Sequence, residues 1–126
     1  MQSKAAGTIS DVKSLYPYRM RRIVINTNDF TLEVELPERL IEEANISIER
    51  GISVKVVLSE AKSNTVLESD IAYSGEVYAA REGEVYISFG GILAKVSGNY
   101  PSWLKVGKKL YLGLSFGEKP DCKALS

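Results

Sequence analysis

Apolar and polar residues alternate without a break over residues 30–36, which predicts a β-strand with one buried face. A second run of β-favouring residues covers residues 21–26. Asn28 and Asp29 lie between the two runs, and their side chains favour turns. The two runs therefore predict a β-hairpin.

A second hairpin is predicted at Gly90-Gly91, which lies between apolar, β-favouring runs at residues 85–89 and 92–96. A two-residue hairpin turn needs positive φ at one or both central residues, and glycine adopts it without a Cβ clash. We therefore expect a tight turn at these two glycines.

The remaining pattern is mostly β. Further strands are expected at residues 8–15, 46–48, 54–58, 73–80 and 109–116. Only residues 37–44 suit a short helical turn, and the polar residues 60–70 indicate a surface loop. Seven or eight short antiparallel strands favour a small closed β-barrel, with a sandwich as the rival. Gly75 and Gly113, inside strand patterns, suit barrel corners.

The length and composition fit one domain. The chain has 126 residues, of which 44% are hydrophobic and 25% charged. We expect a flexible N-terminus over residues 1–7, a single barrel domain over residues 8–116 and a mobile C-terminal tail over residues 117–126.

The composition also predicts a cytoplasmic protein. No stretch approaches the roughly 20 apolar residues of a membrane span, and the first residues lack the apolar region of a secretory signal. The single cysteine, Cys122, cannot form an internal disulfide. Basic and acidic residues number 16 each, so the zero net charge gives no general attraction to nucleic acid or anionic lipid.

No residue pattern indicates an enzyme. Histidine, the usual general base near neutral pH, is absent. Glu33 and Glu35 share one face of the predicted strand but are interpreted as solvated surface charge. No metal-binding spacing is present, and a strand rather than a helix follows Gly90-Gly91, which argues against a phosphate-binding loop. We expect no catalytic residue, no metal and no cofactor.

Two local groups of basic residues provide a candidate nucleic-acid contact. They lie near Tyr16, Tyr18, Tyr100 and Trp103, so that stacking and phosphate contacts could combine as they do in single-strand binders. The two groups are Arg19, Arg21 and Arg22, and Lys105, Lys108 and Lys109. Trp103, the only tryptophan, is expected either to plug one barrel end or to anchor a protein partner.

The second half of the chain also carries a specific resemblance. Three segments share it: Tyr73-x-Gly75-x-Val77-Tyr78, then Tyr86-Ile87-Ser88-Phe89-Gly90-Gly91-Ile92-Leu93-x-Lys95-Val96-x-Gly98, then Leu110-Tyr111-Leu112. In these segments the chain resembles subunit eight of multisubunit DNA-directed RNA polymerases, a family with archaeal and eukaryotic members. The resemblance extends more loosely back to Thr8. Eukaryotic members carry a longer acidic insertion where residues 60–70 run here, so this chain is more similar to the archaeal form.

The resemblance implies a fold and a role. It implies an antiparallel β-barrel of oligonucleotide-binding (OB-fold) type and a non-catalytic accessory subunit docked on the largest polymerase subunit. From the charge balance, the hydropathy and the filled barrel, we also expect weak or absent direct nucleic-acid contact, no membrane and no small-molecule ligand. The candidate docking residues are Gly75, Tyr78, Phe89, Gly90, Gly91, Ile92 and Leu93.

Two alternatives remain open from the sequence. One is a free OB-fold module that binds single-stranded nucleic acid through the basic and aromatic residues named above. The other is a small-ligand carrier, which requires an open apolar space inside the barrel.

Overall fold

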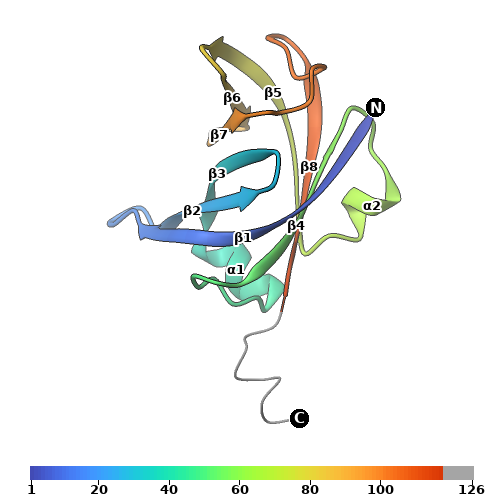
Figure 1. Cartoon of the computed structure of the whole chain (residues 1–126). Coiled ribbons are helices and arrows are strands. Elements are labelled where there is room, and N and C mark those ends of the chain that lie inside the picture. The colour runs from blue at the N-terminus through green and yellow to red at the C-terminus, as the bar shows by residue number, and fades with distance from the viewer. Residues whose placement is uncertain (118–126) are drawn as a thin grey trace.

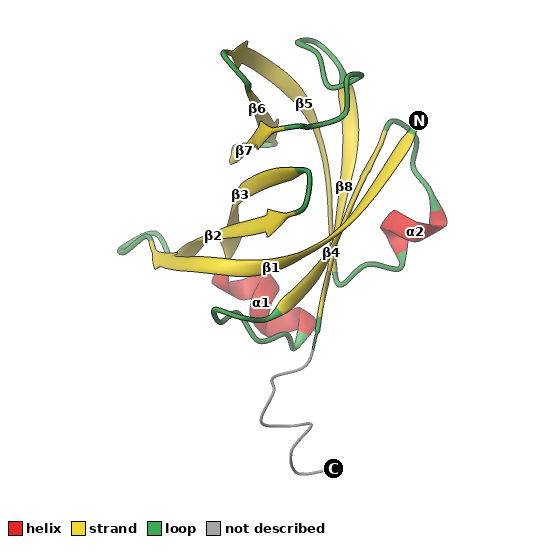
Figure 2. Ribbon diagram, viewed as in Figure 1, coloured by secondary structure: helices red, strands yellow, loops and turns green. Residues whose placement is uncertain are grey.

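The computed structural model describes residues 1–117, which form eight strands and two short helices (Figure 1). The strands are β1 (Gln2–Ser14), β2 (Met20–Thr27), β3 (Phe30–Pro37), β4 (Ser53–Ser59), β5 (Ile71–Arg81), β6 (Glu84–Phe89), β7 (Ile92–Gly98) and β8 (Lys109–Phe116). The helices are α1 (Glu38–Ala44), between β3 and β4, and α2 (Asn64–Leu67), between β4 and β5 (Figure 2).

The eight strands form a closed antiparallel barrel, so the predicted all-β fold of small OB-like type is confirmed. The strand order is β1-β2-β3-β7-β6-β5-β8-β4. The pairing of β4 with β1 completes the ring, from Gln2 opposite Ser59 to Thr8 opposite Ser53. Each strand therefore has a hydrogen-bonded neighbour on both sides, which removes the exposed sheet edges of a sandwich.

The barrel interior is filled by one continuous cluster of apolar side chains. Alternation decides which residues enter it, because successive strand residues point to opposite faces. In β3, for example, Leu32, Val34 and Leu36 are fully buried, whereas the intervening residues lie on the outer face. A filled interior gives no support to the carrier interpretation, which needs an open apolar space.

The glycine hairpin forms as predicted. Gly90 and Gly91 have φ of +63° and +100°, and Phe89 pairs directly with Ile92 across the turn. Gly75 is required for another reason. A Cβ there would collide with the Ser88 carbonyl and the Phe89 ring, so β5 can approach β6 this closely only with glycine.

The N-terminus does not follow the prediction. Residues 2–7 are not a flexible extension but the first half of β1, paired residue by residue with β4. Alanine, serine, lysine and glutamine in this segment have little intrinsic preference for strands. The long-range pairing with the apolar β4 decides the conformation.

Two other segments also differ from prediction. Residues 46–48 form no strand. Instead, Ile48 is buried in the core from a loop. Residues 60–70 are not only loop but include α2, which begins after Ser63. The Ser63 hydroxyl accepts a hydrogen bond from the Val66 N–H at 3.3 Å, and the Val66 side chain is buried. The helical turn predicted over residues 37–44 forms as α1.

The predicted tail begins at Gly117, whose N–H donates to the Ser53 carbonyl at 2.8 Å. Its other residues, 118–126, lie outside the described part of the chain. Within residues 1–117, neither helix has the length and apolar character needed to cross a bilayer.

Removal of residues 1–7 tests the role of β1 in closing the barrel. The deletion strips β4 of its partner over most of its length, so we expect it to remove most of the roughly 5–15 kcal/mol by which a domain of this size is stable. Urea unfolding measures the loss. Substitution of the exposed Gln2 and Lys4 side chains by alanine keeps the backbone pairing and should change little. A truncated protein as stable as the full chain would show that the pairing is dispensable.

Candidate docking surface

Three apolar or aromatic side chains lie on the outer face of β5, β6 and β7: Tyr78, Tyr86 and Leu93, which together we call the outer-face patch. Their neighbours Val77, Val85 and Ile87 point into the core. The register brings the strands together, with Tyr86 opposite Ala79 and Leu93 opposite Ser88. The patch is therefore built on three hydrogen-bonded strands.

A β-bulge sets the position of Tyr78. Val77 pairs with Ile87 and Ala79 pairs with Tyr86, so Tyr78 is the extra residue that has no partner of its own in β6. Bulges redirect a side chain and increase local twist. The Tyr78 ring packs at a tilt against the Tyr86 ring, with centroids 6.3 Å apart, and the Tyr78 residue remains 50% exposed.

Shallow hollows border the patch on two sides. One, of about 310 Å³, is lined by Arg22, Glu33, Glu35, Tyr78, Tyr86, Leu93, Ala94 and Lys95. The other, of about 440 Å³, is lined by Ser74, Gly75, Glu76, Tyr78, Ser88, Gly90 and Lys109. Tyr78 lines both, so this residue lies between the two depressions. Leu93, 45% exposed, borders the first.

The charged groups beside the first hollow form ion pairs with one another. Lys95 Nζ lies 2.7 Å from Glu33 Oε2 and 3.3 Å from Glu84 Oε2. The Tyr86 hydroxyl donates to Glu84 Oε1 at 2.9 Å. Hydrogen bonds from Tyr86 and Lys95 lower the pKa of the Glu84 carboxyl, and the hydrogen bonds to Glu33 and Glu84 raise the pKa of Lys95. Lys95, Glu33 and Glu84 therefore each have a fixed partner.

Glu35 bridges the place where β3 and β7 separate. Their pairing ends at Val34 and Ala94, and beyond it the Leu93 N–H donates to a Glu35 carboxylate oxygen at 2.9 Å. The other carboxylate oxygen lies 3.4 Å from an Arg22 nitrogen. The Tyr73 hydroxyl donates to the Glu35 carbonyl at 3.2 Å, and burial, with the Glu35 charge second, raises the pKa of Tyr73. The Glu35 side chain thus connects β3 to β7 beyond the end of their backbone pairing.

The predicted docking residues are only partly brought together. Tyr78 and Leu93 are exposed on the outer face, and Ile92 is half-buried against the core. Phe89 corrects the sequence prediction, because it is 5% exposed and its ring lies 5.2 Å from that of Tyr73 inside the barrel. Gly75, Gly90 and Gly91 shape the backbone beneath the patch.

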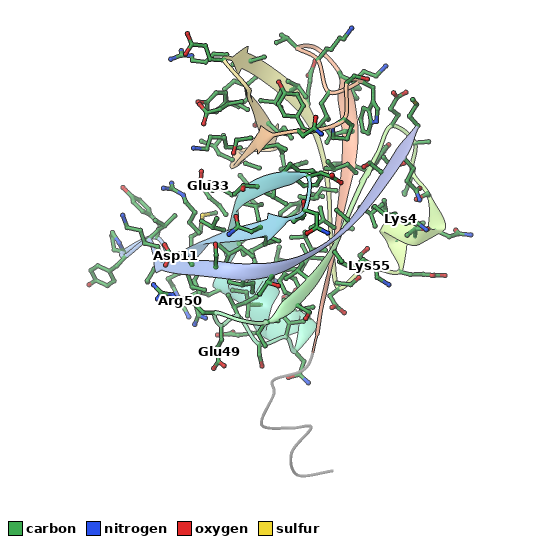
Figure 3. The ribbon with its side chains drawn as sticks, in the orientation of Figure 1. Lys4, Asp11, Glu33, Glu49, Arg50 and Lys55 are labelled. Carbon is green, nitrogen blue, oxygen red and sulfur yellow. The ribbon has the colours of Figure 1, made fainter. Side chains whose placement is uncertain are left out.

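The sequence prediction does not include every part of this surface. Tyr86 is absent from the predicted docking residues, although it alternates with the inward Val85 and Ile87. Glu33, labelled in Figure 3, and Glu35 are not simply solvated. Glu33 is held by Lys95, and the Glu35 side chain is only 14% exposed. The hairpin register, which places Arg22 opposite Glu35, is the signal that could have revealed this pair.

The two basic groups do not form one surface. Arg19, Arg21 and Arg22 lie on the β1–β2 hairpin at the left of Figure 1, whereas Lys105, Lys108 and Lys109 lie before or at the start of β8, at the top. Some of these basic side chains already approach carboxylates of the same chain. Arg19 and Arg21 lie 3.8 and 3.9 Å from Glu38, and Lys108 lies 3.6 Å from Glu60.

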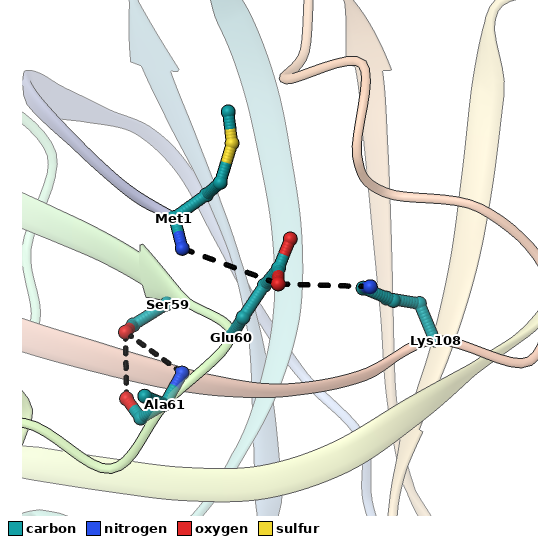
Figure 4. A network of polar contacts seen from close by, with 5 residues as sticks. All are labelled: Met1, Ser59, Glu60, Ala61 and Lys108. Atoms are coloured by element: carbon teal, nitrogen blue, oxygen red, sulfur yellow. Dashed lines mark hydrogen bonds and ion pairs between the residues drawn. The ribbon is translucent and has the colours of Figure 1, made fainter.

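In the second basic group, one lysine of the three approaches a carboxylate within residues 1–117. Glu60 receives both Lys108 and the amino group of Met1, at 3.6 and 4.0 Å (Figure 4). Lys105 and Lys109 remain exposed. Trp103 and Tyr100 are half-buried and pack against the core cluster, which favours the barrel-plug interpretation of Trp103 over an exposed anchor.

In the part of the chain that the structure describes, no cluster of three or more histidine, cysteine, aspartate or glutamate residues could hold a metal ion.

The chain was compared with models of known protein families and with curated protein sequences. It matches none of them.

The substitution Lys95→Met tests whether the ionic network supports the surface. Because the pKa of Glu84 is lowered in the folded protein, its contribution is present above the ordinary glutamate pKa of 4.5 and is lost as the pH falls through the lowered value. We expect the variant to melt a few degrees below the wild type at pH 7 and the difference to shrink at pH 3. Thermal melting across this range measures it. A difference independent of pH would contradict the ionic explanation.

Proposed function

We propose that the protein is a non-catalytic accessory subunit of an archaeal DNA-directed RNA polymerase, which docks on the largest subunit through the outer-face patch. The observation that carries this proposal is the placement of Tyr78 and Leu93. Both belong to the segments that resemble the polymerase subunit, and both are exposed on the same outer face of the barrel. The resemblance and the exposed surface therefore coincide.

The local chemistry suits protein contact. Tyrosine is enriched among residues that dominate binding energy, and such residues lie in patches whose surroundings exclude water. On the side of the first hollow, the rim of this patch carries carboxylates already held by Lys95 and Arg22. A partner can therefore cover this side of the patch without leaving an isolated charge buried, which is energetically expensive.

The closed barrel also favours docking for an entropic reason. Binding has to offset the ordering of side chains and loops at the interface. Tyr86 and Leu93 stand on paired strands, and Tyr78 occupies a defined bulge between paired residues. Little backbone freedom remains to be lost, so the contact works through a preformed surface rather than through folding on binding.

Replacement of Leu93 by aspartate tests the proposal. A carboxylate at this position adds an unpaired charge beside Glu35 on the surface that the partner would cover. We expect tagged Leu93→Asp protein to recover at least about tenfold less RNA polymerase from its native lysate than the wild type. The ratio is measured by quantitative mass spectrometry of the largest polymerase subunit.

A matched control is available in Leu67→Asp, since Leu67 is 55% exposed and lies on α2, outside the patch. This variant should recover polymerase at the wild-type level, and both variants should melt near the wild-type temperature. Ile92 is a poorer position, because it packs against the core. Equal recovery of polymerase by the Leu93 and Leu67 variants would show that the patch is not part of the interface. Failure of the wild type to recover polymerase would contradict the proposed function.

Binding of single-stranded nucleic acid, the alternative, predicts a different response. Neutralisation of several phosphates makes binding weaken steeply with salt. Here Arg19, Arg21 and Lys108 already approach carboxylates, which reduces the charge available to phosphates. We expect fluorescence anisotropy with a labelled oligodeoxythymidine to show no tight binding at about 50 mM salt, and a salt-sensitive submicromolar complex would revive the alternative.

A further inference from the structure

The tip of the β1–β2 hairpin carries two tyrosines that face water. Tyr16 is 90% exposed and Tyr18 is 79% exposed, and Pro17 stands between them. The tip projects at the left of Figure 1, away from β6 and β7 at the top. These two rings therefore belong neither to the core nor to the outer-face patch.

The backbone of the tip is fixed despite its exposure. The Leu15 N–H donates to the Met20 carbonyl at 2.8 Å, and the Tyr18 N–H donates to the Leu15 carbonyl at 2.9 Å. The Arg19 carbonyl accepts the Glu38 N–H at 2.9 Å, which ties the tip to the start of α1. The turn thus presents both rings from a defined position, which lowers the entropic cost of contact.

The charge around the tip is positive. The sequence has no acidic residue between Asp11 and Asp29. Asp11 is held by Arg50 at 2.9 Å (Figure 3). Glu38 is shared by Arg19 and Arg21, so one carboxylate faces two guanidinium groups. Within residues 1–117, Lys13 on the same hairpin forms no ion pair.

This positive charge is small, so a protein is favoured over nucleic acid as the binding partner of the tip. Single-strand binders use several free cations along the phosphate backbone. Here Arg19, Arg21 and Arg22 are already beside carboxylates, and the unbalanced charge amounts to Lys13 and one of the two arginines that share Glu38. The main feature left for recognition is two tyrosine rings beside arginine, a combination typical of the residues that dominate protein–protein binding.

We propose that the residue 15–19 tip is a second docking site, which inserts Tyr16 and Tyr18 into an apolar pocket with carboxylates at its rim on a partner protein. The carboxylates complement Arg19 and Lys13, and the pocket removes the two rings from water. This inference goes beyond the proposed function, because the tip and the outer-face patch lie at different places on the barrel. A subunit that makes both contacts would connect two separate partner surfaces.

Photo-crosslinking in the native assembly identifies what the tip touches. The full-length tagged protein carries Tyr18→benzoylphenylalanine, and a second version carries Leu93→benzoylphenylalanine. After illumination in cells, mass spectrometry identifies the linked peptides. We expect position 18 to link to a protein peptide that contains aspartate or glutamate, and this peptide should differ from the one linked at position 93.

Competition between differently tagged copies measures the contribution of the rings. Wild-type protein and the Tyr16→Ser/Tyr18→Ser variant are expressed together, and the variant should be recovered with the crosslinked partner about tenfold less often. Val106→Ser is the matched control, because Val106 is 60% exposed in the loop before β8, at the other end of the barrel, and should compete equally. Both variants should melt like the wild type, since all substituted side chains are exposed.

Three results would overturn the proposal: crosslinks from position 18 to nucleic acid, no protein crosslink from position 18 while position 93 still links, or equal recovery of the tyrosine variant and the wild type. The proposed function fails separately. If position 93 links to an assembly other than RNA polymerase, the polymerase proposal is wrong. The crosslinks from position 18 still test whether the tip is a docking site.

Discussion

The pairing of β1 with β4 is the constraint on which the rest of the structure depends. It joins the first strand of the chain to the fourth and closes the ring, from Gln2 opposite Ser59 to Thr8 opposite Ser53. With the ring closed, alternation along each strand divides the residues into an inner set that fills the core and an outer set in contact with water. The inner set is committed to packing, so functional contacts are left to the outer face and the turns.

The two surfaces that we propose as docking sites share a physical design. In each, tyrosine side chains are held outward by a local departure from regular strand geometry: a bulge at Tyr78 and a hydrogen-bonded turn around Tyr16 and Tyr18. In each, nearby charges are largely paired within the chain. Recognition then rests on burial of aromatic surface from a fixed backbone, with charge setting orientation. This division of roles is consistent with the proposed contacts to other proteins.

Local chemistry determined which features could be predicted. The Gly90-Gly91 turn follows from glycine's access to positive φ, and β3 follows from alternation over residues 30–36. Residues 2–7 could not be recognised as a strand, because their pairing with β4 is a long-range contact that overrides weak local preference. Phe89 was predictable in principle, since alternation from Val85 through Ile87 points it inward. Its position at a turn obscured that signal. The turn at residues 15–19 is indicated by Pro17, which fixes φ and removes a hydrogen-bond donor, whereas the Tyr78 bulge has no simple sequence pattern.

The central claim is that the outer-face patch is covered by a partner in the working assembly. Hydroxyl-radical footprinting of the protein, free and within its native assembly, tests this directly because it reports the exposure of individual side chains. The account predicts that Tyr78 and Leu93 are oxidised in the free protein and protected in the assembly, while Leu67 on α2 is oxidised equally in both. Unchanged oxidation of Tyr78 and Leu93 in the assembly would contradict the account.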